Sequence, residues 1–274
     1  MIKNPVKVAS YHPYAFATIV FWALAYILTR LALRHFTPLS LGFLRYFVAS
    51  CALVGFVCVC KIRPPSMADV LHFALSGAMG FFAYVIAFNK GSETVSASTS
   101  SVVVATAPIM TAFLARFLYG EKLVRLQWAA VALEFAGILI LALGRGSLTV
   151  DVGIFWLLGA ALSLSLYNLL QRKLTQRYTS LCASSYSIFA GTVMLAVFLP
   201  SALPELWHAP MRLVLCVVLL GLLSSAAAYV LWSRALQLAP NTMSVSNYMF
   251  LTPFLATIFG YLLGGERPDL PTLA

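Results

Sequence analysis

Residues 84–121, YVIAFNKGSETVSASTSSVVVATAPIMTAFLARFLYGE, and residues 229–266, YVLWSRALQLAPNTMSVSNYMFLTPFLATIFGYLLGGE, are two copies of one pattern. An offset of 145 residues places Tyr84-Val85 on Tyr229-Val230, Ser101 on Ser246, Pro108 on Pro253 and Gly120-Glu121 on Gly265-Glu266. The proline precedes the glutamate by 13 residues in both copies. Two unrelated apolar helices can share hydrophobicity, but they have no reason to share proline, glycine and glutamate at one spacing. The chain therefore contains an internal repeat.

Both copies lie within long apolar runs that are typical of transmembrane helices. About 20 apolar residues in a helix cross the hydrocarbon core of a bilayer. Six runs contain no Asp, Glu, Lys or Arg, namely residues 70–89, 94–115, 152–171, 178–204, 213–233 and 238–263. Three further runs contain one such residue each, namely 13–33 with Arg30, 38–60 with Arg45 and 126–144 with Glu134. We therefore predict an all-α polytopic membrane protein with nine transmembrane helices.

The composition agrees with a chain that lies almost wholly in the bilayer. Of its 274 residues, 61% are hydrophobic and only 9% are charged, which is too few to cover a soluble domain. The net charge of +10 could indicate a nucleic-acid partner, but the basic residues lie at the ends of the apolar runs. With the N-terminus in the cytoplasm, eleven of them lie inside and six outside. This bias predicts a cytoplasmic N-terminus, and the basic residues form no nucleic-acid-binding patch.

The repeat also predicts how its two halves are oriented. Each unit contains five spans, and an odd number means that consecutive copies enter the membrane from opposite sides. Such inverted repeats are typical of secondary transporters, with a solute site near the bilayer midplane between the halves. We place the first repeat at residues 13–144 and the second at residues 152–274. A tenth helix would begin near Pro271 and the sequence ends at Ala274, so we expect this helix to be missing from a fragment or a truncated reading frame.

Short motifs within the repeat carry a family resemblance. They are Ala87–Gly91, Ser96–Ser98, Ala107-Pro108, Gly120-Glu121 and Glu134–Leu139 in the first half, and Trp232, Ala235-Leu236, Ala239-Pro240, Pro253 and Gly265-Glu266 in the second. As a set they resemble the EamA family of the drug/metabolite transporter superfamily, over nearly the whole chain. The resemblance implies a central cavity lined by the first, third and fourth helices of each half. It also implies that the second helices, about 38–60 and 178–203, act as gates, and that the fifth and tenth form a peripheral scaffold.

The helices that would line this cavity carry aromatic and small polar side chains, which suit a neutral or zwitterionic organic solute with apolar parts. The cavity-lining candidates are Trp22, Tyr26, Tyr84, Phe88, Ser98, Ser101, Tyr167, Asn168, Tyr229, Trp232, Asn247 and Tyr248. The repeat relates Tyr84 to Tyr229, which makes this pair the leading candidates. Aromatic residues also form interfacial belts or pack between helices, and this remains the alternative for each of them.

The two prolines and the two Gly-Glu pairs of the repeat have structural interpretations. Pro108 and Pro253 lie near the middle of their spans, where each removes a backbone hydrogen bond, and we predict a helix kink at both. Gly120-Glu121 and Gly265-Glu266 are predicted to form tight turns, because glycine permits the turn and glutamate suits the start of the next helix.

Two ionisable residues lie inside predicted spans. A charge at the centre of a transmembrane helix costs about 2.5–3.5 kcal/mol, so each must be paired, neutralised or in contact with water. For Glu134, in the fifth span, proton coupling and a buried ion pair are the hypotheses. For Arg45, in the second span, we expect a structural or gating role, through snorkelling or a pair across the bundle, in preference to contact with a solute.

Enzymatic chemistry finds little support in the sequence. The four histidines, His12, His35, His72 and His208, lie apart and near span ends, and there is no metal-ligand, nucleophile-elbow or phosphate-loop motif. We expect no catalytic residue, no metal and no cofactor.

The prediction is a secondary transporter that exports amino acids or related small metabolites across the cytoplasmic membrane by alternating access, with a small-molecule solute and lipid as partners. A non-transporting fragment and a membrane-embedded transferase are the alternatives, and the oligomeric state is not indicated.

Overall fold

The computed structural model describes residues 10–119 and 152–265, and all regular structure in these two ranges is helical. Eight helical segments are long and apolar enough to cross a membrane, namely His12–Ala32, Pro38–Val59, Met67–Thr94, Ala97–Phe117, Val152–Thr175, Ser180–Trp207, Met211–Leu238 and Thr242–Gly264. They correspond to eight of the nine predicted spans. The predicted fifth span, at 126–144 with Glu134, lies outside the described residues, as do Gly120, Glu121 and Glu266.

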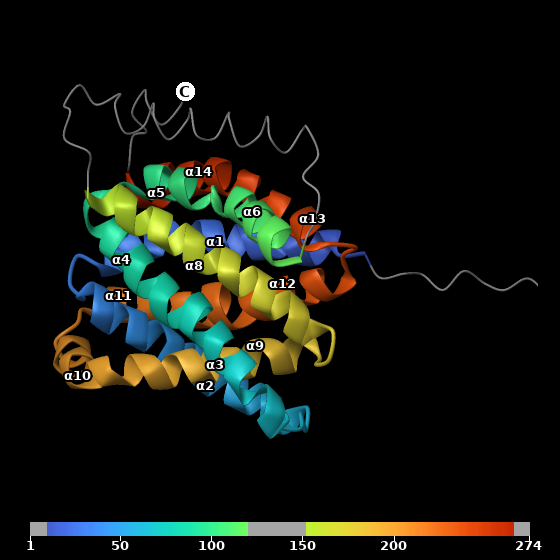
Figure 1. Ribbon diagram of the computed structural model, residues 1–274. Coiled ribbons are helices and arrows are strands. Elements are labelled where there is room, and N and C mark those ends of the chain that lie inside the picture. Colours follow the sequence, from blue (N-terminus) through green and yellow to red (C-terminus); the bar gives the residue numbers. More distant parts are fainter. Residues whose placement is uncertain (1–9, 120–151, 266–274) are drawn as a thin grey trace, which may run out of the picture.

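The eight segments contain the following elements (Figure 1). In the first half they are α1 (His12–Ala32), α2 (Pro38–Val59), η1 (Met67–Asp69), α3 (Val70–Gly77), η2 (Ala78–Ala83), α4 (Tyr84–Thr94), α5 (Ala97–Val104) and α6 (Ala107–Tyr119). In the second half they are α8 (Val152–Thr175), α9 (Ser180–Leu195), η3 (Ala196–Phe198), α10 (Leu199–Trp207), α11 (Met211–Leu219), η4 (Leu220–Ala227), α12 (Ala228–Leu238), α13 (Thr242–Ser246), η5 (Asn247–Leu251) and α14 (Thr252–Gly264). The third span of each half passes through a π-helical segment, η2 or η4, at its middle.

The helix ends have matching chemistry in the two halves. Thr37 and Thr179 are the N-caps of α2 and α9, and their side chains accept from the backbone N–H three residues later. At the C-terminal end of α4, Arg30 donates to the carbonyls of Ser92, in the last turn, and of Val95, the C-cap. At the C-terminal end of α12, Arg172 likewise donates to the carbonyls of Leu236, Ala239 and Pro240. These arginines satisfy carbonyl groups that the helix itself leaves without donors.

Both prolines of the repeat lie where a span is interrupted. Helix α5 ends at Val104 and α6 resumes at Ala107, so Pro108 is in the first turn of α6. Pro253 is likewise in the first turn of α14, after the 3-10 segment η5. A proline lacks the N–H that a helix interior requires, but the first turn does not need that donor. At the far end of α14, Gly265 adopts the left-handed conformation with φ 63°, which makes it a glycine C-cap.

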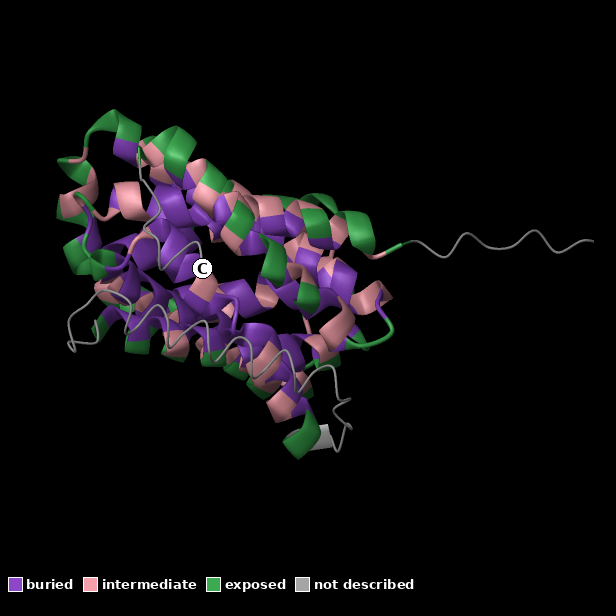
Figure 2. Ribbon diagram, turned by 90° about the horizontal axis from the view of Figure 1, so that it is seen from above, coloured by how far each residue is buried: buried purple, intermediate pink, exposed green. Residues whose placement is uncertain are grey.

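The halves interlock, and each places helices against the other. Helix α1 packs on α12 and α14, α4 packs on α8, and α2 packs on α9. Buried residues lie in the interior of the bundle, whereas exposed residues lie on the outer helix faces (Figure 2). Large apolar side chains such as Phe56, Phe117 and Phe254 are among those outer residues, as expected of helix faces that contact lipid.

Glycines allow the closest helix contacts. At Gly77 of α3, a Cβ atom would lie 2.7 Å from the backbone N of Gly191 and from the carbonyl oxygen of Ser187 on α9. Between α4 and α8, a Cβ at Gly91 would lie 2.5 Å from Leu157 Cγ, and one at Gly153 would lie 2.3 Å from Thr94 Oγ1. Small residues at such contacts let helix backbones approach within a membrane, where packing replaces hydrophobic burial as the main attraction.

Candidate functional site

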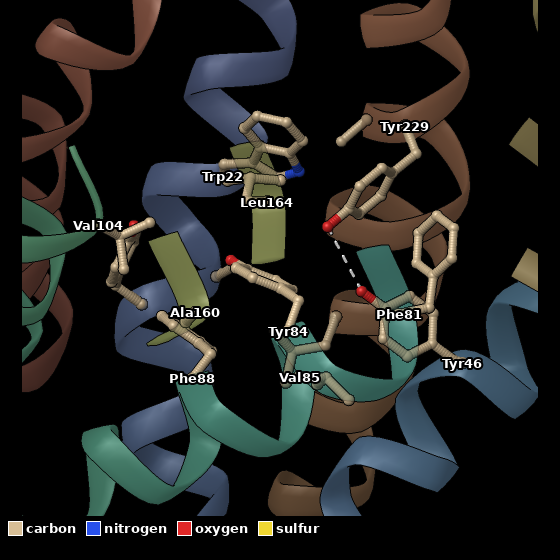
Figure 3. Close-up of a cluster of buried hydrophobic side chains, with 14 of the residues drawn as sticks. Trp22, Tyr46, Phe81, Tyr84, Val85, Phe88, Val104, Ala160, Leu164 and Tyr229 are labelled. Atoms are coloured by element: carbon tan, nitrogen blue, oxygen red, sulfur yellow. Dashed lines mark hydrogen bonds between the residues drawn. The ribbon is translucent and has the colours of Figure 1, made fainter. Parts of the chain in front are cut away.

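Aromatic side chains fill the centre of the molecule, where the two halves meet (Figure 3). They are Trp22 and Tyr26 of α1, Tyr46 of α2, Phe81 of η2, Tyr84 and Phe88 of α4, Tyr167 of α8, and Tyr229 and Trp232 of α12. Ring centroids lie 4.8 Å apart for Trp22 and Trp232, and 5.1 Å apart for Tyr26 and Phe88. These distances are typical of packed aromatic pairs. The hydroxyl groups of Tyr46 and Tyr229 lie 3.5 Å apart and join α2 to α12.

A small cavity lies beside this aromatic cluster. Its walls are formed by Trp22, Ala25, Tyr26, Arg45, Tyr84, Phe88, Val104, Leu164, Met249 and Thr252, which come from both halves. Its volume is about 10 Å³, and a single water molecule requires about 10–15 Å³. An organic solute can occupy this space only after the surrounding helices separate.

Arg45 of α2 brings a positive charge to the cavity wall. Its side chain is buried, with 2% of its surface exposed. The Nε atom donates to Ser225 Oγ at 2.6 Å, and Nη2 donates to the Ser224 carbonyl at 3.3 Å, so the guanidinium connects α2 to η4 of the other half. Its Cζ atom lies 5.4 Å from the ring centroid of Tyr46. Within the described residues, no carboxylate pairs with Arg45, and its Nη1 atom is buried without a hydrogen-bond acceptor.

Three other buried polar atoms of the cluster are without partners in the described part of the chain. They are Trp22 Nε1, the Tyr167 hydroxyl and Asn168 Nδ2. Asn168 uses its Oδ1 atom to accept from Trp232 Nε1 at 2.9 Å. The cluster is therefore rich in unused hydrogen-bonding capacity, which buried polar groups in proteins rarely keep.

A neutral polar network lies next to the cluster, between α3, α8, α9 and α12. Gln171 donates to Ser233 Oγ at 2.7 Å and accepts from Ser76 Oγ at 3.2 Å. Ser184 lies 2.5 Å from the Ser233 hydroxyl and donates to the Tyr229 carbonyl at 2.9 Å. All of these side chains are buried, and the network joins the two halves without charge.

The structure brings most of the candidate residues together. Trp22, Tyr26, Tyr84 and Phe88 line the cavity, and Tyr167, Asn168, Tyr229 and Trp232 belong to the surrounding cluster or contact it.

The four remaining candidates do not line the cavity. Ser98 and Ser101 are buried in α5, where the Ser101 hydroxyl donates to the Ser98 carbonyl at 2.6 Å. Asn247 is exposed, and the Tyr248 hydroxyl contacts the ring of His12 at the start of α1. The 3-10 segment η5 turns the ninth span by about 120° per residue in place of about 100°, so these two side chains lie on another face of that span.

Several wall residues were not among the sequence-based candidates. Tyr46 and Phe81 are fully buried in the aromatic cluster, and Met249 and Thr252 line the cavity. The sequence predicts a structural or gating role for Arg45, and the structure places its side chain at the cavity wall as well as between the halves. The sequence feature that indicates an interior position for Arg45 is the adjacent Tyr46. Two neighbouring large polar side chains in an otherwise apolar helix need an interior environment.

Polar contacts close the bundle at both ends of α2 and the α9–α10 span. At one end, Glu205 of α10 accepts from the backbone N–H and hydroxyl of Thr37 at 2.8 and 2.9 Å, and from Ser40 Oγ at 2.8 Å. At the opposite end, Asp69 accepts from Tyr178 Oη at 2.8 Å and from Arg177 Nη1 at 3.2 Å. The central cavity therefore lies between two polar closures.

The Glu205 closure can be tested by its charge. Glu205→Gln weakens three hydrogen bonds to a carboxylate, and we expect this end to open more often, because bonds to a charged acceptor are about twice as strong as neutral ones. Ala202 of α10 has none of its surface exposed, and a cysteine placed there in a cysteine-free background reports opening. Its maleimide labelling should be about fivefold faster in Glu205→Gln, which corresponds to about 1 kcal/mol. Asp69→Asn, at the opposite end, is the control that should leave this rate unchanged, and equal rates in all three chains would refute the closure.

Comparisons with known proteins agree with this architecture. The model of the EamA-like transporter family matches residues 10–143 and again residues 151–274. The chain is 33% identical to the uncharacterized transporter YdfC of Bacillus subtilis (strain 168), over 92% of this chain and 82% of the relative. It is also 33% identical to a probable terminal-alkyne amino-acid exporter of Streptantibioticus cattleyicolor, over 94% of this chain and 86% of the relative. A crystal structure of a protein with 18% identity superposes with a TM-score of 0.71, covering 96% of this chain and 91% of that one, so it shares the fold.

Proposed function

The chain belongs to the EamA-like transporter family, and on that premise we propose that it exports amino acids or related small metabolites across the cytoplasmic membrane. The observation that carries this proposal is the closed cavity between the halves, with an aromatic wall and buried hydrogen-bond donors. An apolar wall with a few polar groups is the usual build of a small-molecule site. The names of two relatives support this solute class: one is named as a probable terminal-alkyne amino-acid exporter and another, from Salmonella typhimurium, as a probable amino-acid metabolite efflux pump.

The mechanism that we propose is alternating access between two inverted halves. The closures at Glu205 and at Asp69 would open in turn, so that the cavity faces one side of the membrane at a time. With a cytoplasmic N-terminus, α1 runs outward, and the Glu205 closure would be the outer one. A carboxylate at a cavity wall would favour proton coupling, but the described wall residues include none, so we place no proton-coupling role on them.

Export can be tested in cells and in liposomes. Cells that express the chain should resist toxic amino-acid analogues and lose labelled amino acids faster than cells with an empty vector. The purified protein in liposomes should exchange labelled for unlabelled amino acid. Unchanged efflux and no exchange across all twenty amino acids and their common metabolites would refute the proposed solute class.

Tyr84 provides the first variant for this assay. Tyr84→Ala removes an aromatic wall of the cavity that stacks on Phe88 with ring centroids 5.7 Å apart. We expect exchange to fall about tenfold, as for a loss of about 1.4 kcal/mol of solute binding. Tyr261→Ala is the matched control, because Tyr261 lies on the outer face of α14 with 62% of its surface exposed. If both variants exchange amino acid at the same rate with equal membrane abundance, Tyr84 is not part of the solute path.

A further inference from the structure

Arg45 keeps a positive charge at the centre of the molecule without a counter-charge in the described residues. The groups around it are neutral: the Ser225 hydroxyl, the Ser224 carbonyl and the ring of Tyr46. A buried charge is costly unless it is paired, and arginine does not release its proton in proteins. Ser225 accepts from Nε and Ser224 from Nη2, so they hold the guanidinium in place, and Nη1 has no acceptor among residues 10–119 and 152–265.

A second unused donor borders the same cavity. Trp22 Nε1 is buried without an acceptor in the described part of the chain, and both Trp22 and Arg45 line the cavity. The remaining wall is phenolic or apolar, with Tyr26, Tyr84 and Phe88 contributing the rings, except for Thr252, whose buried hydroxyl also has no partner among the described residues. A ligand that fits such a wall must bring acceptors, and it gains most if those acceptors carry negative charge. A carboxylate has two acceptor oxygens and no donor, which matches two N–H groups.

We propose that Arg45 and Trp22 form a binding site for the carboxylate group of the transported solute. The guanidinium donates from Nη1 to one part of the carboxylate and the indole donates from Nε1, while the aromatic wall covers the apolar part of the solute. This inference rests on the proposed function in one respect, that the central cavity is the solute path. It adds a selection rule: organic carboxylates bind, and amines that lack a carboxylate do not.

The site also couples solute binding to the two halves. Arg45 is on α2, but Ser224 and Ser225 belong to η4 of the second half, so the carboxylate would bind where the halves are joined by the guanidinium. A bound carboxylate that neutralises this charge should therefore raise the stability of the folded protein, since the ligand binds the folded protein and not the unfolded chain.

Two sets of three probes separate the carboxylate from the rest of an amino acid. The first set is L-leucine, 4-methylpentanoate, which lacks the amine, and 3-methylbutylamine, which lacks the carboxylate. The second is L-phenylalanine, 3-phenylpropanoate and 2-phenylethylamine. We measure the melting temperature of the full chain in detergent against probe concentration, for wild type and for Arg45→Gln, Arg45→Lys and Trp22→Phe. Arg34→Gln is the matched control, because Arg34 is exposed and the variant loses the same charge elsewhere.

The expected result is that at least one amino acid and its amine-free analogue stabilise the wild type, while neither amine does. Arg45→Gln should need an at least about tenfold higher carboxylate concentration for the same rise in melting temperature. The concentration needed by Arg45→Lys should lie between those of Arg45→Gln and wild type, because lysine keeps the charge but loses the planar fork. Trp22→Phe should bind the carboxylate several-fold more weakly than wild type. Arg34→Gln should match the wild type. If Arg45→Gln does not fold, the carboxylate concentrations that stabilise Arg45→Lys and Trp22→Phe test the site in its place. Stabilisation by the amines equal to that by the acids, or no stabilisation by any carboxylate, would overturn the site.

Exchange in liposomes distinguishes this inference from the proposed function. Arg45-dependent binding of carboxylates without any amino-acid exchange would support the site and refute amino-acid export. Exchange that is equal in wild type and Arg45→Gln would support export and overturn the site.

Discussion

Replacing Gly77 with leucine should abolish most of the folded protein. A Cβ atom at this position would lie 2.7 Å from the backbone N of Gly191 and 2.7 Å from the carbonyl oxygen of Ser187. These are backbone atoms of α9 and cannot rotate away as a side chain would. Helices α3 and α9 would have to separate, at a cost of about 3 kcal/mol or more, which is a large part of the 5–15 kcal/mol that typically stabilises a domain. The measurement is the fraction of monodisperse protein after extraction, together with its melting temperature.

Gly159→Leu is the matched control for this experiment. Gly159 lies on α8 with nothing within 4 Å of an added Cβ atom, and it is exposed on the outer surface of the bundle. A leucine there faces lipid, which favours it, so the yield and melting temperature should equal those of the wild type. If Gly77→Leu and Gly159→Leu give the same melting temperature, the close contact between α3 and α9 does not hold the two halves together.

Hydrophobicity alone was enough to predict the helical spans. The segment predicted at 38–60 is helical from Pro38 to Val59, and the uncharged run 152–171 lies within α8. Such agreement is expected because lipid requires each backbone to satisfy its own hydrogen bonds, which leaves few alternatives to a helix. The fifth span and the inverted arrangement of the halves remain predictions, since residues 126–144 lie outside the described part of the chain.

The candidate site could be predicted only where helical periodicity continued without a break. Tyr84 and Phe88 are one turn apart on α4 and both line the cavity, as do Trp22 and Tyr26 on α1. Periodicity gave no guidance across the 3-10 segment η5, which moves Tyr248 toward His12.

For Arg45, the neighbouring Tyr46 indicates an interior position, but the sequence does not show which groups the guanidinium contacts there. An interior arginine can pair with a carboxylate or line a cavity, and the one-dimensional sequence does not distinguish these outcomes. Here its nearest polar partners, Ser224 and Ser225, are about 180 residues away along the chain. Only the packing of η4 against α2 brings them together.

Joining Ser40 to Ser201 with a disulfide should stop transport completely. The two hydroxyl oxygens lie 3.3 Å apart, between α2 and α10, next to the Glu205 closure. Side chains this close suit the Cβ separation of about 3.5–4.5 Å that a disulfide requires. If alternating access opens this end in every cycle, then a covalent link across it holds the cavity closed on that side. Exchange of labelled amino acid by Ser40→Cys/Ser201→Cys should fall to that of protein-free liposomes after oxidation and return on reduction.

The experiment needs a background without other thiols, because Cys51, Cys58, Cys60, Cys182 and Cys216 are free. Each single variant, Ser40→Cys or Ser201→Cys, controls for the loss of a hydroxyl and should respond to neither oxidant nor reductant. The link must act through movement and not through loss of structure, so the oxidised protein should melt at a temperature no lower than the reduced one. Full exchange by the oxidised, cross-linked protein would mean that α2 and α10 do not separate during transport. The solute path would then have to open elsewhere than between Thr37 and Glu205, and the Glu205 contacts would be structural alone.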